Sequence, residues 1–157
     1  MIDHTPMTVP DADELLERAG FDAEESVLTR RQAEVLVLRE ADVAQADIAE
    51  ELGTSRANVS SVESSARENV AKARETVSFA EVLAAPVQLT VEGGTDLYDV
   101  PNQVYSACDD ADVKVNRTAP ELMKLIGDAA GDAVHGRAVQ RDLIVTVTSD
   151  GEVRVRT

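Results

Sequence analysis

The sequence predicts an α+β protein, with an all-helical N-terminal part followed by a small α/β C-terminal domain. Apolar residues recur at steps of three and four from Leu28 to about Leu83, which is the period of an amphipathic helix. Pro86 interrupts this pattern, and beyond it apolar and polar residues alternate in short segments, as they do in strands. Apolar residues make up 43% of the 157, which is typical of a folded chain.

The composition excludes several classes of protein. Thirty acidic residues against 15 basic ones give a net charge of −15, which argues against a polycation that binds nucleic acid through charge alone. The acids are spread along the whole chain, which indicates a high-salt cytoplasm; an ordinary acidic protein is the alternative. A single cysteine, Cys108, excludes an internal disulfide, and His4 and His135 lack the spacing of metal ligands. Because no apolar run could span a bilayer and no signal peptide is evident, we expect a cytoplasmic protein without a membrane partner.

The first helices are predicted from their end signals. A short acidic helix is expected over 11–19, inside an acidic N-terminal extension, 1–27, to which the sequence assigns no role. The helix after Leu28 begins with a capping box, in which Thr29 is the N-cap and Gln32 reaches back to it. These signals place the start of the main helical domain, 28–83, at Leu28.

Two further helices follow within this domain. A short helix runs from Ala44 to Leu52 and is ended by Gly53 in the left-handed conformation. Thr54 or Ser55 then caps a long helix that extends to about residue 83. Its inward positions are expected to be Val59, Val62, Ala66, Val70, Ala73 and Val77.

Two helices joined by a tight glycine turn are typical of a helix-turn-helix, in which the second helix presents its outer face to the major groove of DNA. The candidate DNA-binding residues are Arg30, Arg31, Thr54, Ser55, Arg56, Ala57, Asn58, Ser60, Ser61, Ser64 and Arg67. Arginine can pair with guanine, asparagine with adenine, alanine can touch a thymine methyl group, and serine can bind a base or a phosphate. Arg30 and Arg31 are candidate phosphate contacts, because cations are otherwise unfavourable at the start of a helix. The alternative is that all these residues are solvated positions on a helical bundle.

The charge around the long helix fits such an interface. The stretch from Thr54 to Val62 contains Arg56 and no acid, although the chain as a whole is strongly acidic. In molar salt the Debye length is about 3 Å, so long-range attraction to phosphates is lost. We therefore expect recognition through short-range hydrogen bonds and shape, with few ion pairs.

The C-terminal part, 86–157, is expected to be a domain for dimerisation or for binding an effector, with the element order β-α-β-α-β-β. The expected elements are a strand at 87–91, a helix at 101–111, a strand at 113–115, a helix at 118–130, and strands at 143–147 and 153–155. Pro101 suits the first turn of a helix, Thr118 and Glu121 form a capping box, and the turn at 149–151 predicts a hairpin.

No catalytic constellation is evident in this domain. Its aspartates, among them Asp96 and Asp99, could supply paired carboxylates, although a solvated acidic face explains them better. Gly93 and Gly94 precede a helix and could cradle an anion, but a plain turn is the simpler interpretation. Cys108 is expected to be a half-buried, unreactive thiol. The sequence therefore indicates no enzyme, cofactor or metal site.

The helical segment resembles the helix-turn-helix shared by LuxR-type response regulators and sigma-factor region four. The residues that carry this resemblance are Leu28-Thr29, Gln32, Glu34-Val35-Leu36, Asp47-Ile48-Ala49, Leu52-Gly53, Ser55, Val59 and Ala66-Arg67. The resemblance implies that 55–64 is the recognition helix, with Arg56, Asn58, Ser60 and Ser61 at groove-facing positions. Many relatives are more basic here, so the serines depart from the family pattern.

A sharper resemblance, covering about 28–157, is to Tfx-type archaeal transcriptional regulators, which join such a helix-turn-helix to a small C-terminal domain. The stretch from Gly94 to Pro101 and the later Gly131-Asp132 are similar to that family's C-terminal pattern. The resemblance implies a sequence-specific regulator of transcription, and an archaeal origin agrees with the high-salt composition.

The sequence thus predicts a regulator that binds double-stranded DNA. A homodimer is expected, with a seam along Val70, Ala73 and Val77 of the long helix, and a small-molecule effector is a further expected partner. The alternative is a protein-interaction module of the transcription machinery that does not touch DNA. A weaker third hypothesis is a small α/β enzyme fused to a regulatory head.

Overall fold

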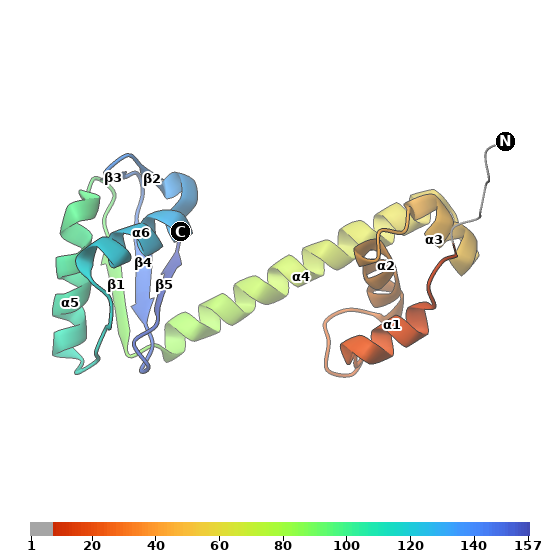
Figure 1. Ribbon diagram of the computed structural model, residues 1–157, viewed down its shortest axis with the longest axis horizontal. Coiled ribbons are helices and arrows are strands. Elements are labelled where there is room, and N and C mark those ends of the chain that lie inside the picture. Colours follow the sequence, from red (N-terminus) through yellow and green to blue (C-terminus); the bar gives the residue numbers. More distant parts are fainter. Residues whose placement is uncertain (1–7) are drawn as a thin grey trace. The chain divides into compact units, whose positions relative to one another are not determined.

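The computed structural model describes residues 8–157, so His4 and the start of the predicted acidic extension lie outside it (Figure 1). The chain divides into two compact units, one ending at Thr76 and the other beginning at Val77. The first unit is helical and the second contains the strands, which confirms the predicted α+β class. The division lies inside a single long helix, whose N-terminal part belongs to the first unit and whose last turns belong to the second.

The helical unit contains α1 (Ala12–Ala19), α2 (Arg30–Glu40), α3 (Gln45–Leu52) and the larger part of α4 (Arg56–Ala84). Their ends follow the predicted signals. Thr29 and Gln32 form the capping box of α2, with both reciprocal hydrogen bonds present. Gly53 ends α3 at φ 68°, and the Ser55 hydroxyl accepts from the Asn58 N–H at 3.1 Å, so Ser55 is the residue that caps α4.

The helices of this unit enclose a small apolar core. Its fully or nearly buried members are Val35, Leu38, Val43, Ile48, Ala49 and Val59. Val9, Ala12 and Leu15 pack against this core, and Leu16 of α1 is 5% exposed. The helix of the acidic extension is therefore an integral part of the helical unit, packed on α2.

The second unit is built on an antiparallel three-stranded sheet in the order β1-β4-β5, with β1 at Val87–Val91, β4 at Leu143–Val147 and β5 at Val153–Arg156. Val87 lies opposite Val147, and Val147 lies opposite Val153. The remaining elements are η1 (Leu97–Asp99), α5 (Val100–Asp110), α6 (Ala119–Ala130), η2 (Gly131–Ala133) and a short hairpin of β2 (Val134–His135) with β3 (Ala138–Val139).

Helices α5 and α6 cover one face of the sheet and bury its apolar side chains (Figure 1). Leu143, Val145 and Val147 alternate inward with Val87 and Val91 opposite them, as the predicted alternation requires. On the other face, Glu81 in the last turns of α4 forms an ion pair with Arg154 of β5. This contact ties the end of α4 to the sheet of the second unit.

The predicted strand at 113–115 is wrong. Val113 and Val115 do alternate inward and pack on the core. Within residues 8–157, however, no strand pairs with this segment, and the sheet order is β1-β4-β5. The observed order is therefore β-α-α-β-β-β-β, since the hairpin of β2 and β3 was also not predicted. Each of those two strands has only two residues, too few to show a period of two.

The inward face predicted for α4 is correct only along its first half. Val59 and Ala66 are buried, whereas Val77 is 57% exposed. Helix α2 contacts α4 at Glu63 and at Asn69. The last α4 residue of the pocket that the two helices line is Arg74, so α2 does not cover Val77.

Candidate nucleic-acid interface

The start of α4 is positioned by its connection to α3. The N–H of Thr54 donates to the Ala49 carbonyl at 2.9 Å, which closes the last turn of α3 around the left-handed Gly53. Ile48 and Ala49 of α3 are buried, as is Val59 of α4. Packing on one side therefore leaves the opposite side of the first turns of α4 open to a partner.

The centre of this open face carries small, uncharged residues. Ala57, Ser60, Ser61 and Ser64 are all exposed and recur at steps of three and four, so they share one side of α4. Within residues 8–157 the hydroxyls of these serines donate no hydrogen bond to the protein. They are free to bind an external donor or acceptor such as a base edge or a phosphate.

Arg56 stands at one margin of this face. Its side chain is exposed and forms no hydrogen bond or ion pair within the described part of the chain. Together with Ala57, Ser60 and Gln45 it lines an open hollow of about 280 Å³ between the starts of α3 and α4. A guanidinium that the protein leaves unpaired beside a hollow is available for bidentate pairing with a guanine or a phosphate.

Asn58 lies near the opposite margin of this face, and its side-chain amide already forms one hydrogen bond. Its amide donates to the Thr54 hydroxyl at 3.0 Å, across the turn that begins α4. Thr54 is half-buried, and Ser55 is used as the N-cap. An amide has a second N–H and a carbonyl oxygen, so Asn58 keeps capacity for an adenine, while Thr54 and Ser55 chiefly shape the turn.

Arg30 and Arg31 lie elsewhere. Gln32 of the same turn accepts from the Asn69 amide at 3.3 Å, and Asn69 lies about 20 Å along α4 from Arg56. Arg30 pairs with Asp13 at 2.6 Å, and the hydrogen bond and charge of Asp13 raise the pKa of the Arg30 guanidinium. Arg31 pairs with Glu34 at 3.2 Å. The structure thus does not bring these two arginines together with the first turns of α4.

Glu63 connects the three helices of the helix-turn-helix. Its side chain is 11% exposed, and its Oε1 lies 2.7 Å from the Arg39 Nε of α2 and accepts from the Gln45 amide of α3 at 3.1 Å. Oε2 accepts from Arg67 Nε at 2.8 Å. Burial alone would raise the pKa of Glu63, but the hydrogen bonds from Arg67 and Gln45 and the two cationic charges lower it below its ordinary value.

This network changes the interpretation of Arg67, which the sequence places among the DNA-contacting residues. Its Nε is engaged by Glu63, although the side chain is 57% exposed and its other donors can reach a phosphate. Arg39 also donates to the Val43 carbonyl at 3.1 Å, so it ties the turn between α2 and α3 to Glu63.

Sequence reasoning did not find Glu63 or Gln45. A signal for Glu63 was present, because a carboxylate four residues after Val59 and four before Arg67 stands on the inward stripe of the helix, where a buried acid needs cationic partners. Gln45 carried no comparable signal, since its role depends on where α3 begins relative to α4.

The candidate residues of the second unit have structural partners. Asp96 caps η1 by accepting from the Tyr98 N–H and pairs with Arg137, and these two contacts lower the pKa of Asp96. The Gly93 N–H donates to the Asp142 carboxylate at 2.8 Å, so the glycine pair forms a closed turn and not an open anion cradle. Cys108 is 2% exposed, more buried than expected, and burial together with Asp109 raises the pKa of its thiol.

Residues 8–157 contain no group of three or more His, Cys, Asp or Glu side chains arranged to hold a metal ion. No helix in this described part is long and apolar enough to cross a membrane.

Comparison with known proteins identifies both parts of the chain. Residues 26–72 match the sigma-70 region 4 family, and residues 73–155 match the family described as the C-terminal part of the DNA-binding protein Tfx. The first match covers the helix-turn-helix, and the second covers more than half of the sequence.

Several relatives match most of the chain. A protein of Haloarcula marismortui, named as a candidate transcriptional regulator, is 60% identical over 93% of this chain and 92% of its own length. A similarly named protein of Methanococcus vannielii is 39% identical over 83% of this chain and 92% of its own. The DNA-binding protein Tfx of Methanothermobacter marburgensis is 34% identical over 85% of this chain and 96% of its own.

The similarity to a protein of a halophilic archaeon confirms the expectation of an archaeal protein adapted to high salt. The family matches and the coverage of these relatives together show that the chain belongs to the Tfx family of DNA-binding proteins.

Proposed function

We propose that the protein is a sequence-specific transcriptional regulator that reads the major groove of double-stranded DNA with the first turns of α4. The observation that carries this proposal is the uncharged face of Ala57, Ser60, Ser61 and Ser64, flanked by Arg56, whose guanidinium forms no hydrogen bond or ion pair within residues 8–157. It lies on the helix that a sigma-70 region 4 helix-turn-helix presents. The relatives' names, which describe DNA binding and regulation of transcription, support the same function.

The composition of this face suits recognition at high salt. Every phosphate neutralised by a cation adds a log–log salt slope of about −0.9 to the affinity, so an interface of many arginines would release its DNA in molar salt. An interface made of Arg56 and several serine hydroxyls depends less on charge, so its affinity for DNA falls less as the salt concentration rises. We propose that Arg56 and Asn58 read bases, that the serines bind bases or phosphates, and that Arg67 adds a phosphate contact.

Replacing Arg56 by alanine is expected to weaken binding to the protein's own DNA site by about 1–3 kcal/mol, because a bidentate contact to a base is lost. Fold stability should change by less than about 0.5 kcal/mol, since the side chain is exposed and unpaired. Fluorescence anisotropy with a labelled site measures the affinity. Lys72→Ala on the same helix is the matched control, and an Arg56 variant that binds as tightly as this control would remove Arg56 from the interface.

We further propose that the protein acts in the cytoplasm as a homodimer, by binding and not by catalysis, and responds to a small-molecule effector. The support for a dimer is the apolar stripe of Val70, Ala73 and Val77 on α4, where Val70 and Ala73 are half-buried and Val77 is 57% exposed. Two-fold symmetry suits a palindromic site with half-sites about one helical turn apart. Light scattering with and without DNA tests this, and a monomer in both conditions would contradict it.

A further inference from the structure

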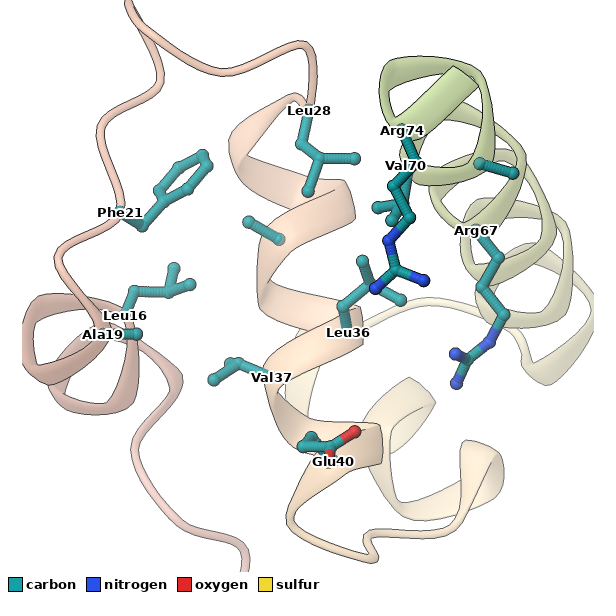
Figure 2. A pocket seen from close by; sticks show the side chains of 12 residues that line it. Leu16, Ala19, Phe21, Leu28, Leu36, Val37, Glu40, Arg67, Val70 and Arg74 are labelled. Atoms are coloured by element: carbon teal, nitrogen blue, oxygen red, sulfur yellow. The ribbon is translucent and has the colours of Figure 1, made fainter. Parts of the chain in front are cut away.

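An apolar groove of about 580 Å³ lies on the helical unit, away from the first turns of α4 (Figure 2). Leu36 and Val37 of α2 form its middle, Leu16 and Phe21 line the side formed by α1 and the segment after it, and Val70 and Ala71 line the side formed by α4. Its volume falls within the range of about 300–1,000 Å³ that is usual for small-molecule sites.

The lining of this groove is apolar but not closed off from water. Phe21, Leu36, Val37 and Val70 are each only half-buried, and Ala71 is exposed. A groove lined mainly by apolar side chains with a few charged groups is the usual form of a small-molecule site.

The charged side chains of the groove differ in whether an opposite charge pairs with them. Arg67 is paired with Glu63 at 2.8 Å. Arg74, one helical turn after Val70, forms no hydrogen bond or ion pair within residues 8–157. Figure 2 shows its side chain extending from α4 toward Leu36, so its guanidinium lies at the apolar surface. The carboxylate of Glu40 lies at the C-terminal end of α2, one turn after Leu36.

We propose that this groove binds a small amphipathic anion, with an apolar body on Leu36, Val37 and Val70 and a single carboxylate or sulfonate on Arg74. The unpaired guanidinium supplies the complementary charge, and its planar donors suit a carboxylate. Glu40 and the net charge of −15 disfavour a second negative charge on the ligand. A monoanion is therefore the class that the site fits.

Binding of this ligand does not depend on the proposed DNA-binding function, whereas its role as an effector does. The groove includes Arg67, Val70 and Arg74 of α4, the same helix whose first turns we propose to read DNA. A ligand that spans α2 and α4 thus contacts both helices that Glu63 joins.

The test uses the full chain, in the salt at which it is folded, with anilinonaphthalene sulfonate as a fluorescent apolar anion. We expect one saturable site per chain, displaced by decanoate more effectively than by decanol, which has the same chain length without the charge. Arg74→Gln should weaken the probe's affinity by about fivefold and abolish the preference for decanoate. Lys72→Gln, which removes a cation from the same helix, should leave both unchanged.

A second variant tests the groove itself. Ala71→Phe places a ring on an exposed position of the groove wall, so it should block the probe without disturbing the core. The proposal is overturned if the folded wild type shows no saturable binding, or if Arg74→Gln and Lys72→Gln behave alike. It is also overturned if Ala71→Phe converts a dimer into a monomer, because a second copy would then cover the groove. Arg56→Ala should bind the probe as the wild type does, which separates this test from that of DNA binding.

Discussion

Replacing Glu63 by glutamine is expected to lower the free energy of unfolding of the helical unit by about 2–3 kcal/mol at neutral pH. Glutamine keeps the shape of the side chain but leaves the guanidinium groups of Arg39 and Arg67 without a counter-charge. Removing one partner of a buried ion pair typically costs about 3–5 kcal/mol. We expect the smaller loss of about 2–3 kcal/mol because Arg67 is 57% exposed and can turn its charge to water.

Chemical denaturation followed by far-ultraviolet circular dichroism measures this loss. Glu68→Gln is the matched control, since Glu68 is on the same helix, pairs with Lys72 at 3.3 Å and is 66% exposed. The control should change stability by less than about 0.5 kcal/mol. Equal stability of the two variants would show that Glu63 does not hold the helices together.

The lowered pKa of Glu63 also predicts how the stability difference between the wild type and Glu63→Gln depends on pH. A carboxyl whose pKa is lowered on folding contributes its full stability above the unfolded value of about 4.3, and loses it as the pH falls through the folded value. The difference in stability between the wild type and Glu63→Gln should therefore be largest above about pH 5 and should narrow as the solution becomes more acidic.

Replacing Gly151 by alanine is expected to lower the stability of the C-terminal unit by about 2–4 kcal/mol. Gly151 lies in the turn between β4 and β5 at φ 84°, which alanine adopts only with strain. A Cβ atom there would also stand 2.2 Å from the carbonyl oxygen of Lys114. Because that atom is backbone, the segment at 113–115 or the turn itself has to move.

The Gly136→Ala variant distinguishes the strain of the backbone conformation from the steric clash of the added Cβ atom. Gly136 has a similar φ of 62°, but a Cβ at this position meets no atom within 4 Å. We expect a loss of about 1 kcal/mol from the backbone conformation alone. Thermal unfolding compares the variants, and a Gly151 variant no less stable than the Gly136 variant would contradict the close packing of the turn on Lys114.

Features that depend on a few neighbouring residues were predictable from the sequence. The capping box of Thr29 and Gln32, that of Thr118 and Glu121, and the left-handed Gly53 were all expected and are present. Each is decided by hydrogen bonds within one helical turn, so the local sequence suffices. The hairpin of β4 and β5 was found for the same reason.

Features that depend on distant partners were not predictable. The alternation of Val113 and Val115 shows which way the side chains point, but a strand also needs a neighbouring backbone, which this segment lacks. The pairing of Arg30 with Asp13 depends on how α1 packs on α2, which the sequence does not reveal. Local pattern therefore predicted where α4 begins, while the partners of the charged residues near it are visible only in the packed structure.

We propose that the first turns of α4 bind a specific DNA sequence. Recovery of genomic DNA fragments by the purified protein in molar potassium chloride, followed by sequencing, tests this proposal. We predict a shared site of roughly two-fold symmetry, retained by Lys72→Ala and lost or relaxed in Arg56→Ala. If the folded protein enriches no sequence above background, α4 does not bind a specific DNA site, and an interaction module without DNA contact becomes the better description.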